Sequence, residues 1–117
     1  MCVFSYIPLY VTPPIVTHDL KLWPEYFEPV ARYEKTFEIR YNDRDYKVDD
    51  WLRLREYCPH LARYTGREVM SRISYITQWE QKPDFVVMAI TKPVPVASDR
   101  DYTDIECVTM PDIYQLN

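Results

Sequence analysis

The stretch that decides the fold is EKTFEIRYNDRDYK, residues 34–47, because apolar and polar side chains alternate along its first half. Alternation of this kind has the period of a β-strand, whose successive side chains point to opposite faces. One face would carry Phe37, Ile39 and Tyr41. The other face would carry Thr36, Glu38 and Arg40. The segment NDRD that follows predicts a turn, since Asn and Asp side chains bond readily to their own nearby backbone.

The segments on either side predict four more strands and one helix. Alternating or continuous apolar patterns mark the strands at residues 18–23, 50–56, 67–77 and 85–90. Pro24 suits the first position of a helix, and Pro29 predicts that this helix is short or kinked and ends near Tyr33. The sequence therefore predicts an α+β fold in which about five strands form a small curled sheet or barrel.

Length and composition indicate one folded domain with two unusual ends. The 117 residues are 47% hydrophobic and 15% aromatic, which supports one core but not two. Residues 1–16 are uncharged and interrupted by prolines, as expected for an extended arm that packs on the body or on a neighbouring molecule. Residues 93–117 form an acidic, proline-containing tail. The domain itself is expected to span residues 17–92.

The net charge of −4 is concentrated in the tail, which holds five acidic residues and one arginine. Residues 1–92 are therefore neutral, with thirteen acidic and thirteen basic residues. A local excess of three positive charges falls within residues 53–72. This distribution argues against nonspecific coating of a nucleic-acid backbone and allows a local binding site.

The cysteines and the apolar start of the chain bear on whether the protein is disulfide-bonded, metal-binding, secreted or membrane-spanning. Three widely separated cysteines suit reduced thiols in the cytoplasm better than a disulfide framework. No Cys/His spacing resembles a zinc site, so neither a metal nor another cofactor is expected. The apolar start of the chain lacks a basic region and contains three prolines, so neither a signal peptide nor a membrane span is expected.

Three explanations account for the polar face of residues 34–47. Its charged side chains can form cross-strand pairs on a wet sheet surface. They can instead line a cleft for a nucleobase, closed by Trp23, Tyr64 or Trp79 as an aromatic wall. An enzymatic site would use Lys35 and Thr36 beside Glu38 as base or nucleophile.

Several ordered segments together resemble a known family. HDLKLWPEYFEPVARYEKTFEIRYNDRDYKVDDWLRLREY, YTGREV and ISYIT are similar to an ASCH domain of the PUA-like superfamily, in particular to its small phage- and prophage-borne group. The similarity runs from about His18 to Ile90. The family signature G-x-K-x-x-E-x-R is met as Tyr33, Lys35, Glu38 and Arg40, so three of its four positions match.

The resemblance implies a PUA-like β-barrel with a cleft beside this motif, and an association with RNA or modified nucleotides. Lys35, Glu38 and Arg40 would line that cleft. Weaker candidates by this resemblance are His18, Lys21, Asn42, Asp43 and Arg44, and the residue pattern itself adds Thr36. Fold-level analogy does not itself establish function.

The departures from the family pattern concern glycine and threonine. Tyr33, Asp49 and Asp84 stand where the family has glycine, and Gly66 is the one glycine of the chain. Glycine at such places serves a positive φ, which is costly for tyrosine and less so for aspartate. Tyr33 would therefore imply a different helix end, a strained backbone or a ring in the mouth of the cleft. Some ASCH proteins hydrolyse acylated cytidine with a Lys-x-x-Thr pair, but Glu38 takes the place of that threonine.

The sequence thus favours a binding module for RNA or a nucleotide-like small molecule. Lys35 and Arg40 would contact phosphate or base, and Glu38 would accept a hydrogen bond from a base amino group. The first alternative is an amidohydrolase acting on modified nucleosides. The second alternative is a protein-interaction module that uses its two ends, including self-association through the N-terminal arm.

Overall fold

The computed structural model describes residues 15–96 and shows an α+β fold with one short helix, as expected. Its elements, in chain order, are β1 Thr17–Leu22, α2 Pro24–Ala31, β2 Phe37–Tyr41, β3 Trp51–Cys58, β4 Arg63–Thr77, β5 Phe85–Ile90 and β6 Val94–Pro95. The helix and the five longer strands fall where the sequence predicts them. Most of the two expected arms lies outside the described residues.

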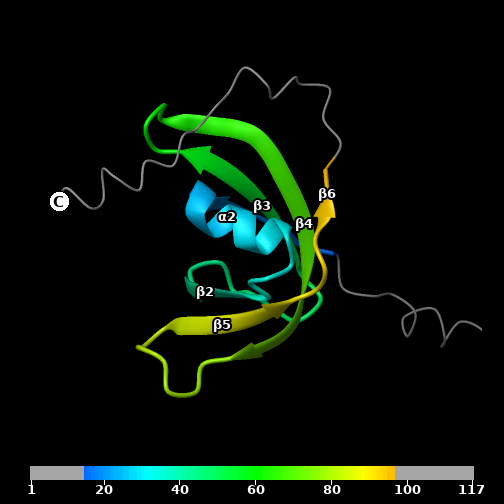
Figure 1. Ribbon diagram of the computed structural model, residues 1–117. Helices are drawn as coiled ribbons and strands as arrows, with labels where there is room; N and C mark the ends of the chain where they lie inside the picture. Colours follow the sequence, from blue (N-terminus) through cyan, green and yellow to red (C-terminus); the bar gives the residue numbers. More distant parts are fainter. Residues whose placement is uncertain (1–14, 97–117) are drawn as a thin grey trace, which may run out of the picture.

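The strands form one strongly curled sheet in the order β1-β3-β4-β5-β2, with the two-residue β6 paired to β4 (Figure 1). β1 runs parallel to β3, and the other pairs are antiparallel. The curl comes from the 15-residue β4, which pairs with β3 along its first part and with β5 along its end. Its register shifts between Ile73 and Tyr75, and such a bulge bends a strand.

Helix α2 lies in the hollow of the curled sheet (Figure 1). Pro24 occupies its start, and Phe27 and Val30 are buried against the sheet. Burial of a side chain the size of Phe27 contributes about 2–3 kcal/mol. The helix and the sheet share one core: Leu20, Leu22, Phe27, Val30, Tyr46, Leu52, Leu54, Val69, Ile73, Val86, Met88 and Ile90.

The sheet does not close into the expected barrel, because its end strands β1 and β2 do not pair and a gap stays open between them. Arginine side chains bridge this gap in place of a backbone ladder. Arg40 donates to the carbonyl oxygen of Lys21 at 2.9 Å, and Arg44 donates to that of Asp19 at 2.7 Å. We call this gap the open seam.

The polar face of β2 does not point to solvent, as it would in a strand on a wet sheet surface. Its apolar side chains are the exposed ones. Glu38 is buried, with 2% of its surface exposed, while Phe37, Ile39 and Tyr41 are 41%, 50% and 53% exposed. The alternation therefore correctly predicted the strand but gave no reason to place its carboxylate inward. A buried carboxylate is tolerated only where cations and hydrogen bonds compensate it, and these are described below.

The positions that resemble family glycines do require a left-handed backbone. Tyr33, Asp49 and Asp84 have φ of 58°, 80° and 67°, beside 100° at Gly66. Tyr33 follows the helix end: its N–H bonds to Val30 O and that of Glu34 to Pro29 O. This pair of bonds defines a Schellman motif, whose left-handed position is usually glycine.

Two further expectations concern Cys58 and the membrane. Cys58 is buried at the end of β3 and is disulfide-bonded, so the expectation of reduced thiols is wrong at this residue. The cytoplasmic location stays a prediction. Within the described part of the chain, no helix is long and apolar enough to cross a membrane.

Replacing Tyr33 with glycine should stabilise the fold. Tyr33 is exposed, so little packing is lost, and relief of its left-handed strain should raise the free energy of unfolding by about 1 kcal/mol. Urea denaturation monitored by circular dichroism measures the change. The matched control is Thr17→Gly at an exposed position of β1, where extended backbone predicts a loss of about 0.5 kcal/mol. Equal losses in both variants would contradict the strain at Tyr33.

Candidate functional site

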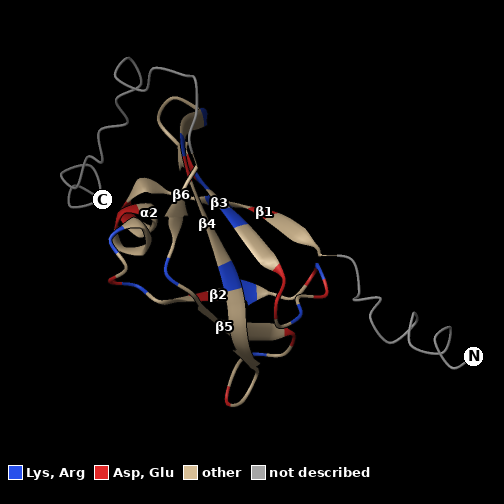
Figure 2. Ribbon diagram, turned by 90° about the vertical axis from the view of Figure 1, so that its right-hand side faces the viewer, with Lys and Arg blue, Asp and Glu red and all other residues tan. Residues whose placement is uncertain are grey.

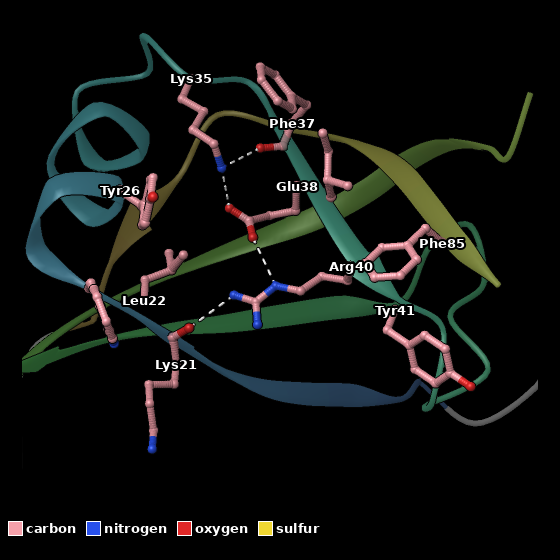
Figure 3. A pocket seen from close by; sticks show the side chains of 11 residues that line it. Lys21, Leu22, Tyr26, Lys35, Phe37, Glu38, Arg40, Tyr41 and Phe85 are labelled. Carbon is pink, nitrogen blue, oxygen red and sulfur yellow. Dashed lines mark hydrogen bonds and ion pairs between the residues drawn. The ribbon is translucent and has the colours of Figure 1, made fainter. Parts of the chain in front are cut away.

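A cleft of about 590 Å³ opens at the seam, between β2 on one side and the end of β1 with the start of α2 on the other (Figure 3). This volume lies in the range of small-molecule sites. Its lining consists of Lys21, Leu22, Trp23, Tyr26, Lys35, Phe37, Glu38, Ile39, Arg40, Tyr41 and Phe85. Lys35, Glu38 and Arg40 therefore meet at one hollow, as the motif predicted; whether they bind a ligand stays a prediction.

Glu38 organises the polar centre of the cleft. Its Oε1 lies 2.6 Å from Lys35 Nζ, and its Oε2 accepts a hydrogen bond from Arg40 Nε at 3.1 Å (Figure 3). Lys35 Nζ also donates to the carbonyl oxygen of Phe37 at 3.0 Å. Both cations are thus held by one buried carboxylate and by backbone carbonyls, which fixes their positions before any ligand arrives.

Local backbone structure places these three side chains. The Schellman motif turns the chain sharply after α2, and the N–H of Lys35 bonds to Pro29 O at 3.0 Å. Lys35 therefore enters at the helix end of the cleft. Glu38 and Arg40 are two positions apart on β2, so both point to the same side of the strand.

The electrostatic balance of this centre favours a ligand with acceptor or anionic groups. Lys35 and Arg40 contribute two positive charges against the single carboxylate of Glu38. Their side chains keep 21% and 26% of their surface exposed, while that of Glu38 keeps 3%. Among the interactions of the described residues, Arg40 Nη1 has no hydrogen-bond partner, so this nitrogen can donate to a ligand.

Aromatic side chains form the two walls of the cleft. Trp23 and Tyr26 come from the start of α2, and Phe37 and Tyr41 come from β2. Tyr41 meets Phe85 edge to face, with ring centroids 5.6 Å apart. A flat heterocycle between these walls would find both apolar surface and nearby cationic donors.

Lys21 lines the cleft through its backbone more than through its amine. Its carbonyl oxygen accepts the hydrogen bond from Arg40, while its amine points away from that group (Figure 3). Lys21 Nζ lies 4.0 Å from the ring centroid of Tyr57 on the outer side of the sheet. A direct contact from this amine to a ligand beside Glu38 is therefore not supported.

The weaker candidates serve structural contacts outside the cleft. His18 is buried, with Nε2 2.8 Å from Asp50 Oδ2 and its ring against Tyr46 at 4.8 Å. Burial raises the pKa of the Tyr46 phenol. Asn42 Oδ1 accepts the N–H of Tyr46 and so closes the turn after β2. The remaining three are not among the lining residues: Thr36, Asp43 and Arg44.

Two of the three aromatic residues considered for the wall also lie elsewhere. Tyr64 packs against the Arg55 guanidinium at 3.8 Å, and Trp79 is exposed in the β4–β5 connection. Only Trp23 lines the cleft. Tyr33 is exposed but is not among the lining residues, so the suggestion that its ring fills the cleft mouth is wrong.

Sequence reasoning missed three lining residues and misjudged others. Leu22, Tyr26 and Phe85 were not considered, and the apolar side chains of β2 were assigned away from the site. Phe85 pairs directly with Tyr41, so the register of β2 against β5 identifies it. Tyr26 precedes the buried Phe27, so a helical projection places it at the rim.

Two further groups of charged side chains are paired within the fold. Glu56 is buried and accepts a hydrogen bond from Thr65 at 2.7 Å, and Arg67 lies 3.5 Å from it and also pairs with Glu28 of α2. The guanidinium of Arg53 donates a hydrogen bond to Glu68, and this bond raises the pKa of Arg53. Within residues 15–96, no cluster of three or more His, Cys, Asp or Glu side chains could hold a metal ion.

Substituting Glu38 with glutamine should destabilise the fold by about 3 kcal/mol, because two partly buried cations lose their shared carboxylate. Chemical denaturation checks this value. The matched control is Glu34→Gln, which removes an exposed ion pair with Arg32 and should cost less than about 0.5 kcal/mol. Similar losses for the two variants would show that the buried carboxylate is not the organising group.

Comparison with known proteins places the chain in a family. A family model described as a domain of unknown function, DUF3850, matches residues 17–90. The "Uncharacterized 12.9 kDa protein in GpA 3′region" of Escherichia phage P2 is 38% identical over 60 residues. That alignment covers 51% of this chain and 53% of the phage protein, so the chain spans about half the length of this curated relative. Since the family model covers more than half of the sequence, the chain belongs to the DUF3850 family.

Proposed function

We propose that the protein binds a nucleotide-like ligand, either free or as part of RNA, in the cleft at the open seam. One observation carries this proposal: the side chains of Lys35, Glu38 and Arg40 meet inside a cleft of about 590 Å³ that has aromatic walls. Nucleotides combine a flat ring that stacks with anionic oxygens that accept hydrogen bonds.

The three charged residues would have different roles in binding, because Lys35 and Arg40 are partly exposed and Glu38 is buried. Lys35 and Arg40 keep exposed donor surface and would contact phosphate or base oxygens. Glu38 engages each of them with one carboxylate oxygen and is almost fully buried. Its main role would be to position the two cations, with a base amino group as an additional donor only if it reaches the same oxygens.

We also infer that the fold is a diverged, open form of the ASCH domain of the PUA-like superfamily. The three matching signature residues lie at the cleft, and the fourth, Tyr33, has the positive φ that the signature glycine would serve. In this interpretation, the open seam is the place where the barrel of the superfamily would close. The arginine bridges from Arg40 and Arg44 to β1 support it.

Binding should depend weakly on salt concentration. The first 92 residues are neutral overall, and Lys35 and Arg40 are the two cationic groups that meet at the centre of the cleft. Affinity for RNA varies with salt in proportion to the number of phosphates neutralised. A site that neutralises one or two phosphates therefore predicts a shallow slope and recognition of a single nucleotide unit.

Removing the polar centre should weaken binding without changing the net charge. We expect Glu38→Gln combined with Arg40→Gln to weaken binding of nucleoside monophosphates and short single-stranded RNAs at least about tenfold, the effect of losing one good charged hydrogen bond. The matched control is Asp45→Asn with Lys47→Gln, which removes an exposed ion pair of the same net charge outside the cleft. Isothermal titration calorimetry measures the affinities, and thermal melting verifies that both variants are folded.

The outcomes separate clearly. Wild-type affinity in the control and loss in the cleft variant would support the proposal. Equal affinity in all three proteins would place binding elsewhere, and absence of binding by folded wild-type protein at millimolar nucleotide would rule out this function.

Hydrolysis of acylated nucleosides has less support. Glu38 stands where the acyl-cytidine hydrolases of the resembling family have threonine, and Thr36 is not among the cleft-lining residues. Lys35 Nζ donates to Glu38 and to a backbone carbonyl, so these contacts hold it away from attack on a substrate carbonyl. We expect no free cytidine when N4-acetylcytidine is incubated with concentrated protein and analysed by chromatography. Turnover that disappears in Lys35→Met would establish the enzymatic alternative instead.

A further inference from the structure

The sheet carries an uncharged, aromatic surface on the side that faces away from the core. It is formed by β2, β5 and the C-terminal part of β4, and we call it the outer face. Its members are Phe37, Ile39, Tyr41, Tyr75, Phe85 and Val87. No charged side chain interrupts β5 or the end of β4, where both strands are drawn without blue or red (Figure 2).

An exposed apolar surface of this kind indicates that another chain segment or molecule covers the outer face. Ile39 and Tyr41 of β2 are 50% and 53% exposed, and Tyr75 of β4 is 64% exposed. β2 and β4 flank β5 on its two sides, and Phe85 and Val87 of β5 lie between them on the same face. Contiguous apolar patches on protein surfaces mark contact sites. Enrichment in aromatic residues and depletion of charge are the composition of an interface centre.

The same chain contains an uncharged segment of matching chemistry. Residues 1–14, MCVFSYIPLYVTPP, carry large apolar side chains and no Asp, Glu, Lys or Arg. Leaving such a segment in water would expose much of its apolar surface, at about 25 cal/mol per Å². We propose that residues 1–14 dock on the outer face of the same molecule.

The connection between segment and face is short enough. Arg44, three residues after the end of β2, donates to Asp19 O of β1, and the ring of His18 packs on Tyr46. The start of β1 and the Tyr41 end of β2 therefore lie at the same end of the molecule. Fourteen extended residues reach about 46 Å, whereas the five residues of β2 extend about 17 Å.

Charge decides between this occupant and a nucleic acid. RNA bound along the outer face would need cations beside the stacked bases to neutralise phosphates. None of the six residues is charged, and the neighbouring cations, Lys35 at 5.1 Å from the Phe37 ring and Arg40, are held by Glu38 at the cleft edge of this face. The aliphatic side chains of Ile39 and Val87 at its centre favour an apolar peptide. The inference goes beyond nucleotide binding, because the donors of Lys35 and Arg40 take no part in it.

Site-specific photo-crosslinking of the full chain tests the proposal. The photoreactive residue p-benzoylphenylalanine replaces Tyr75 on the outer face, or Val94 of β6 as a matched exposed apolar control outside this face. We expect irradiation to join position 75 to peptides from residues 1–14, identified by mass spectrometry, in protein that keeps the monomer mass. Position 94 should give no such product.

A second variant makes the test quantitative. Ile39→Asp should lower the cross-link yield at position 75 about tenfold, because docking would bury an unpaired carboxylate. Val48→Asp, at an exposed apolar residue in the β2–β3 connection, should leave the yield unchanged. Cross-links between two copies would instead identify a dimer interface. That result, a lack of cross-links to residues 1–14, or equal yields at positions 94 and 75 would each overturn the proposal.

Discussion

The structure depends on one buried carboxylate that holds two cations. Glu38 points inward from β2, where an isolated charge would cost several kcal/mol of desolvation. Lys35 and Arg40 each bond to a different oxygen of this group, and Arg40 continues the chain of contacts to the backbone of β1. The helix end, the strand β2 and the opposite edge of the sheet are therefore linked through a single side chain.

The open seam explains why this polar group can be inside at all. If β1 and β2 paired through their backbones, an inward side chain at position 38 would meet only core residues such as Met88, its partner on β5. Because α2 lies in the hollow and the end strands stay apart, the seam leaves room for Lys35 and Arg40 beside the carboxylate. The same feature that prevents closure of the sheet thus creates the cleft.

Local patterns predicted the elements well but could not predict how they turn in space. The period-2 alternation located β2 and the apolar run located β5, and the glycine-like positions were right at Tyr33, Asp49 and Asp84. The inward face of β2 was missed because hydrophobicity assigns Phe37 and Ile39 to the core, and the compensation of Glu38 is visible only once its partners are placed. His18 and Arg44 were candidate ligand contacts for their chemistry, yet tertiary contacts with Asp50 and Asp19 use them for the fold.

Both sides of β2 therefore carry side chains that residues 15–96 do not fully cover. On the inward side, the side chains of Lys35 and Arg40 stay partly exposed and can donate further hydrogen bonds. On the outward side, the apolar side chains of β2 remain exposed. Four residues belong both to the cleft lining and to the outer face: Phe37, Ile39, Tyr41 and Phe85. Whatever covers the outer face therefore borders the cleft as well. An uncharged segment docked there would leave the Lys35–Glu38–Arg40 centre accessible while narrowing the aromatic rim, so that the two surfaces of this one strand shape a common site.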